Sequence, residues 1–284
     1  MKLRKAQVAG SFYSGSKTAL TSEIEGCFTH RLGPGRLPVL ARLWSAKRRI
    51  VGLVCPHAGY TYSGPVAARS YLELAGDGQP EKIVIIGPNH TGQGSGVSIM
   101  SEGVWETPLG QVEVDKMTAA AISKASDIID LDDQAHLYEH SIEVQLPFLQ
   151  YVFQTKFEFV PICMMMQDLE TSAEVGKAIG QALKGENAVI IASSDMTHYE
   201  SAEAAKRKDQ LAIDAILALD DKKLQETVES SRITMCGHGP VASMIAASKM
   251  LNAKTAQLLG YSTSGDITGD NNEVVGYLAA SICK

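Results

Sequence analysis

The sequence has little of what several protein classes require. Aromatic residues make up 6% of its 284 residues and charged residues 20%, and 26 basic side chains are outnumbered by 32 acidic ones, for a formal net charge of −6. This composition is typical of an ordinary globular protein and excludes the disordered, collagenous and coiled-coil classes. The acidic balance offers no electrostatic footprint for nucleic acid or for an anionic membrane, so we expect neither as a partner.

Signals for export are also missing. No apolar run reaches the roughly 18 residues of a membrane span, and the start MKLRKAQVAGSFYSG has no apolar segment of a signal peptide. The five cysteines are an odd number without the spacing of a disulfide framework: Cys27, Cys55, Cys163, Cys236 and Cys283. These features predict free thiols in a reducing, cytoplasmic setting. A CxxC pair, a P-loop and a GxSxG elbow are absent as well.

Short β-branched runs alternate with longer amphipathic ones, the pattern of βα units around a largely parallel sheet. The runs are continuous rather than alternating, as in strands covered on both faces. The predicted strands are Ile50–Cys55, Lys82–Ile86, Phe157–Cys163, Ala188–Ala192, Thr255–Tyr261 and Val274–Ile282. The predicted helices are Lys17–His30, Gly64–Ala75, Lys116–Ser126, Glu139–Val152, Leu169–Lys184, Ala202–Leu219 and Pro240–Leu251. We therefore predict one α/β domain over residues 1–284, with a largely parallel central sheet flanked by helices.

Three predicted strands each end in a polar loop that carries a histidine. His57, His90 and His198 follow the runs that begin at residues 50, 82 and 188. Ligands of open α/β sheets bind beyond the carboxyl ends of the strands, where such loops meet. The pattern predicts that the three histidines share one site; the alternative is that each is a loop histidine bonded to backbone.

Cys236 stands in the segment Met235-Cys-Gly-His-Gly-Pro240, just before an apolar helix whose first turn Pro240 suits. The exposed N–H groups of a helix start lower the pKa of a nearby thiol, so we expect a thiolate here. Thiolate and imidazole together suit Fe, Cu or Zn. The alternative is an inert buried cysteine at a helix start.

The segment His136-Leu-Tyr-Glu139-His140 matches the inverted zincin pattern, in which two histidines hold Zn and the glutamate is the general base. The match is short, and Pro147 would kink or shorten the helix predicted there. A hydrogen-bonding role for His140 and Glu143 beside another metal site is the other interpretation.

Eight short motifs, in order along nearly the whole chain, resemble the Memo family, whose bacterial and archaeal members are often called AmmeMemoRadiSam system protein B. They are Val8-Ala-Gly-Ser-Phe-Tyr13, Pro56-His-Ala-Gly-Tyr-Thr-Tyr-Ser-Gly64, Gly87-Pro-Asn-His90, Trp105-Glu-Thr-Pro-Leu-Gly110, Glu139-His-Ser-Ile-Glu143 with Gln145-Leu-Pro147, Ser193-Ser-Asp-Met-Thr-His198, Cys236-Gly-His-Gly-Pro240 and Val274-Val-Gly-Tyr277. The family is similar in fold to class III extradiol ring-cleaving dioxygenases, which use non-haem Fe(II).

The resemblance implies that His57 and His90 are metal ligands and that Cys236 is the third. The dioxygenases have a glutamate as the third ligand, and a thiolate makes the site softer and raises its affinity for copper. The implied metal is Fe(II), with Cu or Zn as alternatives. Ring cleavage does not follow from the fold alone, because function resides in the site.

The resemblance also implies catalytic roles. His198 matches the acid/base histidine of the dioxygenases, Asp195 supports the site, and His140 belongs to a family motif that we place at the rim of the pocket. In the extradiol version, His198 takes a proton from a substrate hydroxyl.

Three functions remain open from the sequence. The first is a mononuclear iron or copper protein that carries out redox or extradiol-like oxidation of a small molecule. The second is a non-catalytic binding protein that uses a vestigial pocket for a partner or peptide; by family association its partners would be AMMECR-type and radical SAM proteins. The third is zinc hydrolysis through His136, Glu139 and His140.

Overall fold

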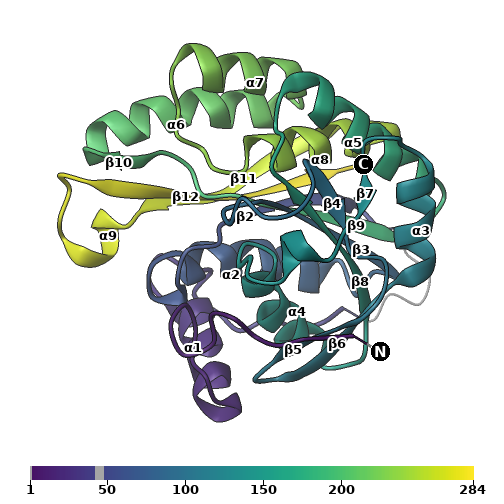
Figure 1. The fold of residues 1–284 in the computed structure, drawn as a ribbon. Helices are drawn as coiled ribbons and strands as arrows, with labels where there is room; N and C mark the ends of the chain where they lie inside the picture. The colour runs from purple at the N-terminus through teal and green to yellow at the C-terminus, as the bar shows by residue number, and fades with distance from the viewer. Residues whose placement is uncertain (1, 42–47) are drawn as a thin grey trace.

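A computed structural model describes residues 2–41 and 48–284 of the chain; Met1 and residues 42–47 of the predicted domain lie outside the described residues. In the described part, the strands form one mixed sheet whose path runs β1-β5-β6-β8-β3-β9-β2-β12-β10, with β11 paired to β12 and β4 to β7 and β8 (Figure 1). The strands are β1 (Leu3–Arg4), β2 (Ile50–Cys55), β3 (Lys82–Pro88), β4 (Val97–Ile99), β5 (Val104–Thr107), β6 (Gly110–Val114), β7 (Asp130–Leu131), β8 (Glu158–Met164), β9 (Ala188–Ser193), β10 (His198–Glu200), β11 (Thr255–Thr263) and β12 (Val274–Cys283).

Helices cover both faces of this sheet (Figure 1). On one face α5 packs against α8, with α3, α6 and α7 beside them; on the other face α1, α2 and α4 pack together. The helices are α1 (Lys17–Thr29), α2 (Tyr60–Gly76), α3 (Lys116–Lys124), α4 (Leu146–Phe153), α5 (Leu169–Ala182), α6 (Ala202–Leu217), α7 (Asp221–Ser230), α8 (His238–Met250) and α9 (Gly265–Thr268), with 3-10 turns at Gln134–His136 and Glu143–Gln145.

Two apolar cores result, one on each side of the sheet. Along β3, Val84 and Ile86 enter one core, whereas Ile83 and Ile85 enter the other. Side chains of a strand alternate between its faces, so a strand covered on both sides has to be apolar throughout. The predicted α/β domain with a largely parallel sheet flanked by helices is confirmed.

Several helix starts are fixed by side chains just before them. Ser16, Asp115, Asp168, Ser201 and Asp220 each accept a hydrogen bond from a backbone N–H of the first turn of α1, α3, α5, α6 and α7. Such caps contribute about 1 kcal/mol each, because they pair donors that the helix itself leaves open.

One predicted helix is wrong at its start. The chain from residue 139 to 142 is not helical, and α4 begins only at Leu146, with Pro147 in its first turn. Proline suits a helix start because its missing N–H would be unpaired there in any case. Helix α7 and the short strands β1, β7 and β10 were not predicted.

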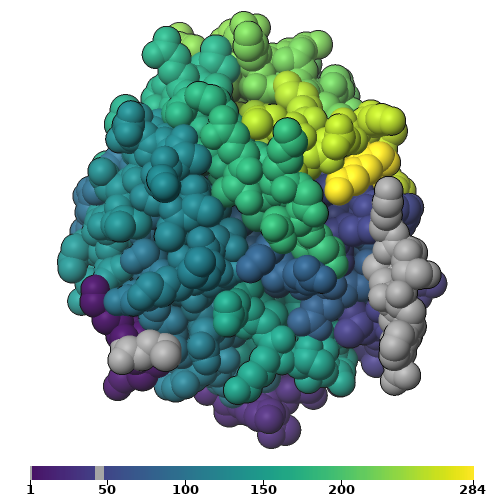
Figure 2. All heavy atoms as spheres, turned by 90° about the vertical axis from the view of Figure 1, so that its right-hand side faces the viewer, coloured from purple at the N-terminus to yellow at the C-terminus, as the bar shows by residue number. Residues whose placement is uncertain are grey.

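Figure 2 shows the molecule from the amino ends of its central strands. The C-terminal end of the chain (yellow) reaches this face. The N–H of Lys284 donates to the carbonyl of Arg49, just before β2. The carboxyl ends of the same strands, where the sequence predicts the site, lie at the opposite edge of the sheet. In the described residues no helix is both long and apolar enough to cross a membrane.

A candidate metal centre

The strands β2, β9 and β3 are parallel neighbours in that order, and their carboxyl ends lie level. Cys55 pairs with Ser193 across β2 and β9, and Ile86 pairs with Ala192 across β3 and β9. The loops that begin at residues 56, 89 and 194 therefore leave the same edge of the sheet, as the sequence predicts.

Three histidines gather at this edge. Ring nitrogens of His57, His90 and His140 all lie within 4.8 Å of one another. The ring centroid of His57 lies 5.2 Å from that of His90 and 5.5 Å from that of His140. The rings of His90 and His140 stack, with their centroids 4.7 Å apart. Nitrogen ligands about 2.0–2.1 Å from a tetrahedral metal are roughly 3.3 Å apart, so small side-chain shifts would let all three reach one ion. His140, expected at the rim, is thus a member of the cluster.

The hydrogen bonds of Ser193 set the tautomer of His57. The Ser193 hydroxyl donates its one proton to the carbonyl of Ser141 at 2.6 Å, and it accepts from the Gln145 amide at 2.8 Å. His57 Nδ1, 2.9 Å from the same oxygen, must therefore be the donor. This leaves Nε2 of His57 with a free lone pair, the state that a metal ligand needs.

Glu139 orients the ring of His90 and lies near that of His140. Its buried carboxylate accepts from the backbone N–H and Nδ1 of His90, at 2.5 and 2.9 Å, and lies 3.4 Å from Nδ1 of His140. Burial raises the pKa of Glu139, but the hydrogen bonds and charges of the two histidines outweigh it and lower the pKa to about 2. A carboxylate behind a histidine fixes its Nδ1–H tautomer and makes Nε2 a better ligand.

Two histidines of the cluster, His57 and His140, have lowered pKa values. Burial, followed by the neighbouring histidines, lowers the pKa of His57 well below its usual 6.5. Burial also lowers the pKa of His140, although Glu139 opposes the shift. Protons therefore compete little with a metal ion at neutral pH.

A close approach of two segments brings His140 to the strand ends. A Cβ at Gly87 would lie 2.4 Å from Oγ of Ser141, so only glycine allows residues 139–143 to lie against the end of β3. Ser141 Oγ then donates to the carbonyl of Pro88 at 3.0 Å.

Cys236 lies beside the cluster. Its Sγ is 3.2 Å from Nε2 of His57 and accepts from the backbone N–H of Asp195 at 3.3 Å. A Cβ at Gly237 would lie 2.5 Å from the carbonyl oxygen of Ser193, so glycine is needed for this approach as well. The expected thiolate is a wrong prediction for the metal-free chain: burial, then the charge of Asp195, raises the pKa of Cys236.

Asp195 and His198 lie on the loop after β9. Oδ1 of Asp195 accepts from the backbone N–H of His57 at 2.8 Å, and burial raises the pKa of Asp195 to about 6. The Nδ1–H of His198 donates to the carbonyl of Thr234 at 2.9 Å, which leaves its Nε2 unprotonated in the neutral ring. His198 is near enough for its charge to lower the pKa of His57.

His136 and His140 face different parts of the molecule. The His136 side chain is fully buried, and its ring centroid lies 6.0 Å from that of Trp105. Within residues 2–41 and 48–284, neither of its ring nitrogens has a hydrogen-bond partner. It is not among the three clustered histidines. His238, also unassigned from the sequence, pairs through Nδ1 with Oε1 of Gln225 at 2.8 Å.

The sequence interpretation missed the anchors of these rings. Ser193 and Glu139 both stand in quoted motifs, but spacing gives no sign of which histidine each one contacts. The inverted zincin pattern gives Glu139 the role of a general base, whereas in the structure its oxygens accept from N–H groups of residues 90, 140 and 141.

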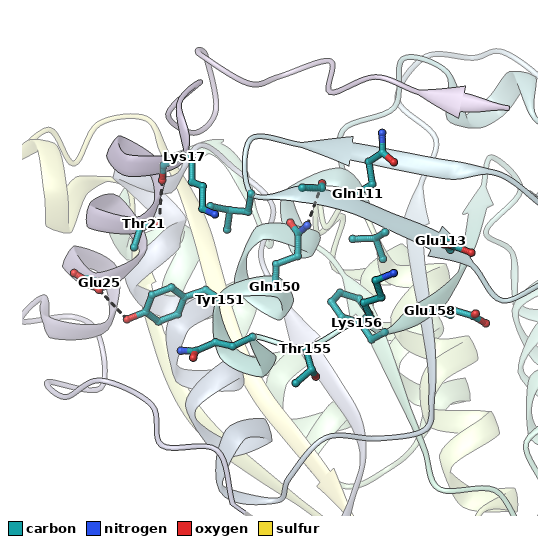
Figure 3. A pocket seen from close by; sticks show the side chains of 15 residues that line it. Lys17, Thr21, Glu25, Gln111, Glu113, Gln150, Tyr151, Thr155, Lys156 and Glu158 are labelled. Carbon is teal, nitrogen blue, oxygen red and sulfur yellow. Dashed lines mark hydrogen bonds between the residues drawn. The ribbon is translucent and has the colours of Figure 1, made fainter. Parts of the chain in front are cut away.

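A separate groove of about 980 Å³ lies between α1, β6 and the end of α4 (Figure 3). Its rim mixes Lys17 and Lys156 with Glu25, Glu113 and Glu158. Since Glu158 is the first residue of β8, the groove lies at the amino end of that strand, away from the histidines.

Similar proteins are found along the whole chain. Residues 4–281 match the family model described as Memo-like protein. A MEMO1 family protein of Methanothermobacter thermautotrophicus is 52% identical over 277 residues, 97% of this chain and 98% of the relative. One of Methanopyrus kandleri is 50% identical over 278 residues, 97% of each chain. The structure of an uncharacterized Escherichia coli K12 protein has a TM-score of 0.55 at 14% identity, over 82% of this chain and 99% of that one; it is similar in fold alone.

Proposed function

Because this chain belongs to the Memo family, we propose that its three clustered histidines bind one first-row transition-metal ion. One observation carries the proposal: His57, His90 and His140 place ring nitrogens within 4.8 Å of one another. The hydrogen bonds on Nδ1 of His57 and His90 leave Nε2 of these two rings free for a metal. The family resemblance read from the sequence motifs is confirmed.

The donor set fits such an ion. Neutral imidazoles suit iron, copper and zinc, and Cys236 adds a soft ligand next to His57. In this proposal His57, His90 and His140 supply nitrogen, and Cys236 binds as the thiolate and releases its proton when the metal enters. We take Fe(II) as the resident metal because the family resemblance implies it, with copper and zinc as the alternatives that the test separates.

The proposed reaction is the oxidation of a small diol by O₂. When bound, Fe(II) would supply the Lewis-acid and redox chemistry for the reaction of O₂ with the diol. Nε2 of His198 accepts the proton of a substrate hydroxyl, since its Nδ1–H is held by Thr234. Asp195 keeps the backbone of His57 in place through the 2.8 Å hydrogen bond. In an extradiol cleavage both oxygen atoms enter the ring-opened product, so no further reductant is consumed.

The metal is tested by purifying the chain without oxygen and measuring bound iron, copper and zinc by mass spectrometry. We expect about one equivalent in the parent and a large loss in His57→Ala and His90→Ala. His30→Asn is the control, because His30 lies at the end of α1, outside the cluster. Equal metal content in the parent and both cluster variants would overturn the site.

The reaction is tested by oxygen uptake with a panel of diols. We expect uptake in the iron-loaded parent and its collapse in His198→Ala, a variant that should keep its metal because His198 is outside the cluster. If the loaded parent consumes no diol, the oxidation is wrong and the binding-protein alternative gains support.

A further inference from the structure

The N-terminal strap, residues 8–13, lies beside the histidine cluster. It is a compact turn: the carbonyl of Val8 accepts from the N–H groups of Ser11 and Phe12, and the N–H of Gly10 donates to the carbonyl of Tyr13 at 2.7 Å. Gly10 has φ +87°, in the left-handed region that glycine enters without strain. The strap is therefore a defined turn rather than an extended arm.

Two parts of the molecule hold the strap. Glu143, fully buried, accepts from the N–H of Val8 at 3.0 Å and from the hydroxyl of Tyr13 at 2.6 Å. The carbonyl of Phe12 accepts from the N–H of Tyr60 at 2.7 Å, and this N–H is one of the donors that the start of α2 leaves open. The strap is thus tied both to the segment of His140 and to the loop of His57.

This anchoring places the Phe12 ring on His140. The two ring centroids lie 4.8 Å apart with an interplanar angle of 57°. Among the described residues, the one polar contact of the His140 ring is the 3.4 Å approach of its Nδ1 to Glu139, which is long for a hydrogen bond. Packing by rings therefore decides where this imidazole points, in contrast to His57 and His90, whose Nδ1 atoms are both bonded at 2.9 Å.

We propose that Phe12 is a positioning residue that holds the His140 imidazole against His90 and toward His57, and so decides whether the cluster offers a metal three imidazoles or two. This inference rests on the proposed metal site. Phe12 supplies no ligand atom of its own; it acts through His140. The sequence motif around Phe12 then serves the site, although it lies more than 120 positions from His140.

Removing the ring should lower metal affinity through His140 alone. In Phe12→Ala the imidazole loses the aromatic ring on the strap side and keeps its contacts with His57 and His90 and the long approach to Glu139. Loss of a group that orients a ligand lowers metal affinity about 10–100-fold. Phe12→Tyr keeps the flat ring and should bind metal about as tightly as the parent, whereas Phe12→Leu keeps apolar bulk without the ring and should fall between.

The experiment uses the full chain and Co²⁺ as the probe, with the dissociation constant and the visible spectrum as readouts. We expect Phe12→Ala to weaken Co²⁺ binding at least about tenfold and to shift the spectrum toward that of His140→Ala. In the double variant Phe12→Ala/His140→Ala, the dissociation constant should stay within about twofold of that of His140→Ala, because the two changes remove the same ligand.

The outcomes separate this inference from the proposed function. An equal weakening by Phe12→Ala in both backgrounds, or none in the parent, would overturn the positioning role. A Co²⁺ spectrum of His140→Ala equal to that of the parent would also overturn the positioning role. If His57→Ala still weakened Co²⁺ binding strongly in that case, the proposed metal site would stand. If His57→Ala and His90→Ala also bind Co²⁺ as the parent does, the proposed function itself fails. A misfolded strap would weaken Co²⁺ binding in the His140→Ala background as well, so the double variant separates misfolding from the loss of positioning.

Discussion

Glu139 and Glu143 are both fully buried carboxylates of one short segment, but they serve different regions of the molecule. In the cluster region, Glu139 accepts only N–H groups, among them the titratable ring of His90. The strap region comprises the strap, Glu143, Arg4 and His136. Here Glu143 pairs with the buried guanidinium of Arg4, which also donates to the carbonyl of Glu139. The carboxylate that holds the strap is thus paired with a guanidinium, which stays charged. The carboxylate of the cluster is paired instead with an imidazole that can also bind a metal.

The two histidines of the same segment repeat this division. His140 is part of the cluster, whereas His136 is buried in the strap region, where the side chain of Arg4 donates to its backbone carbonyl. The two are four positions apart in the sequence, yet the His140 ring stacks on another histidine, whereas neither ring nitrogen of His136 has a hydrogen-bond partner in the part of the chain that the structure describes. Residue type alone therefore does not tell a site residue from a core residue here.

The largest expected effect lies in the strap region. Glu143→Ala leaves the buried Arg4 without its carboxylate, so we expect the free energy of unfolding to fall by about 3–5 kcal/mol. Urea unfolding of the metal-free chain measures it. Glu203→Ala is the control, because its pair with Arg207 is exposed and contributes less than about 1 kcal/mol. A similar small loss in both variants would mean that the strap is not held through Glu143.

His136 offers a pH-dependent way to test the same region. Burial, then the charge of Arg4, lowers the pKa of His136 from 6.5 to about 4. Between these two values the unfolded chain binds a proton that the folded chain does not, so stability is present above pH 6.5 and falls toward pH 4. The full effect is about 3 kcal/mol, from about 1.4 kcal/mol per pKa unit.

In His136→Leu this loss should disappear. The variant should gain on the parent as the pH falls from 7 to 4, and it should already be about 1 kcal/mol more stable at pH 7, because two unpartnered nitrogens are removed. Urea unfolding at several pH values measures the difference in the free energy of unfolding between variant and parent. The contributions of the other histidines are the same in both chains and cancel. A constant difference across this range would show that His136 is not the group that titrates.

The core of the site follows from the sequence because it depends on strands. The apolar runs ending at Cys55, Ile86 and Ala192 are strong local signals, and parallel strands must bring their carboxyl ends to one edge. The meeting of His57 and His90 is therefore predictable from periodicity and loop position alone.

The place of His140 is not predictable in this way. The periodic pattern predicts a helix from Glu139, but the Glu139 side chain accepts the N–H groups of His140 and Ser141 and so competes with helical hydrogen bonds. The raised pKa of the Cys236 thiol is likewise due to burial, which outweighs the effect of the helix that follows it. Both depend on contacts between segments far apart in the sequence.

In the cluster region the charged anchor should matter most. Glu139→Gln keeps the shape but removes the negative charge behind His90 and His140, so we expect metal affinity to fall about 10–100-fold. Titration with Zn²⁺ under competition by a chelator measures the change. Glu203→Gln, on the surface of α6, should leave the affinity unchanged. Unchanged affinity in Glu139→Gln would mean that the carboxylate does not act on the ligands.

Loss of the neutral anchor, the Ser193 hydroxyl, should have the smallest effect on metal affinity. It tests whether an uncharged hydrogen bond also orients a ligand. Ser193→Ala removes the acceptor of the His57 Nδ1–H, so this ring can adopt either tautomer and no longer offers Nε2 in every molecule. Hydrogen bonds to charged groups are roughly twice as strong as neutral ones. We therefore expect Zn²⁺ affinity to fall only about three- to tenfold, less than in Glu139→Gln, because about 1 kcal/mol of orientation is lost. The same chelator titration compares the two variants at one pH. If Ser193→Ala weakens binding as much as Glu139→Gln, ring orientation rather than charge controls the ligands, and the two anchors of the cluster act in the same way.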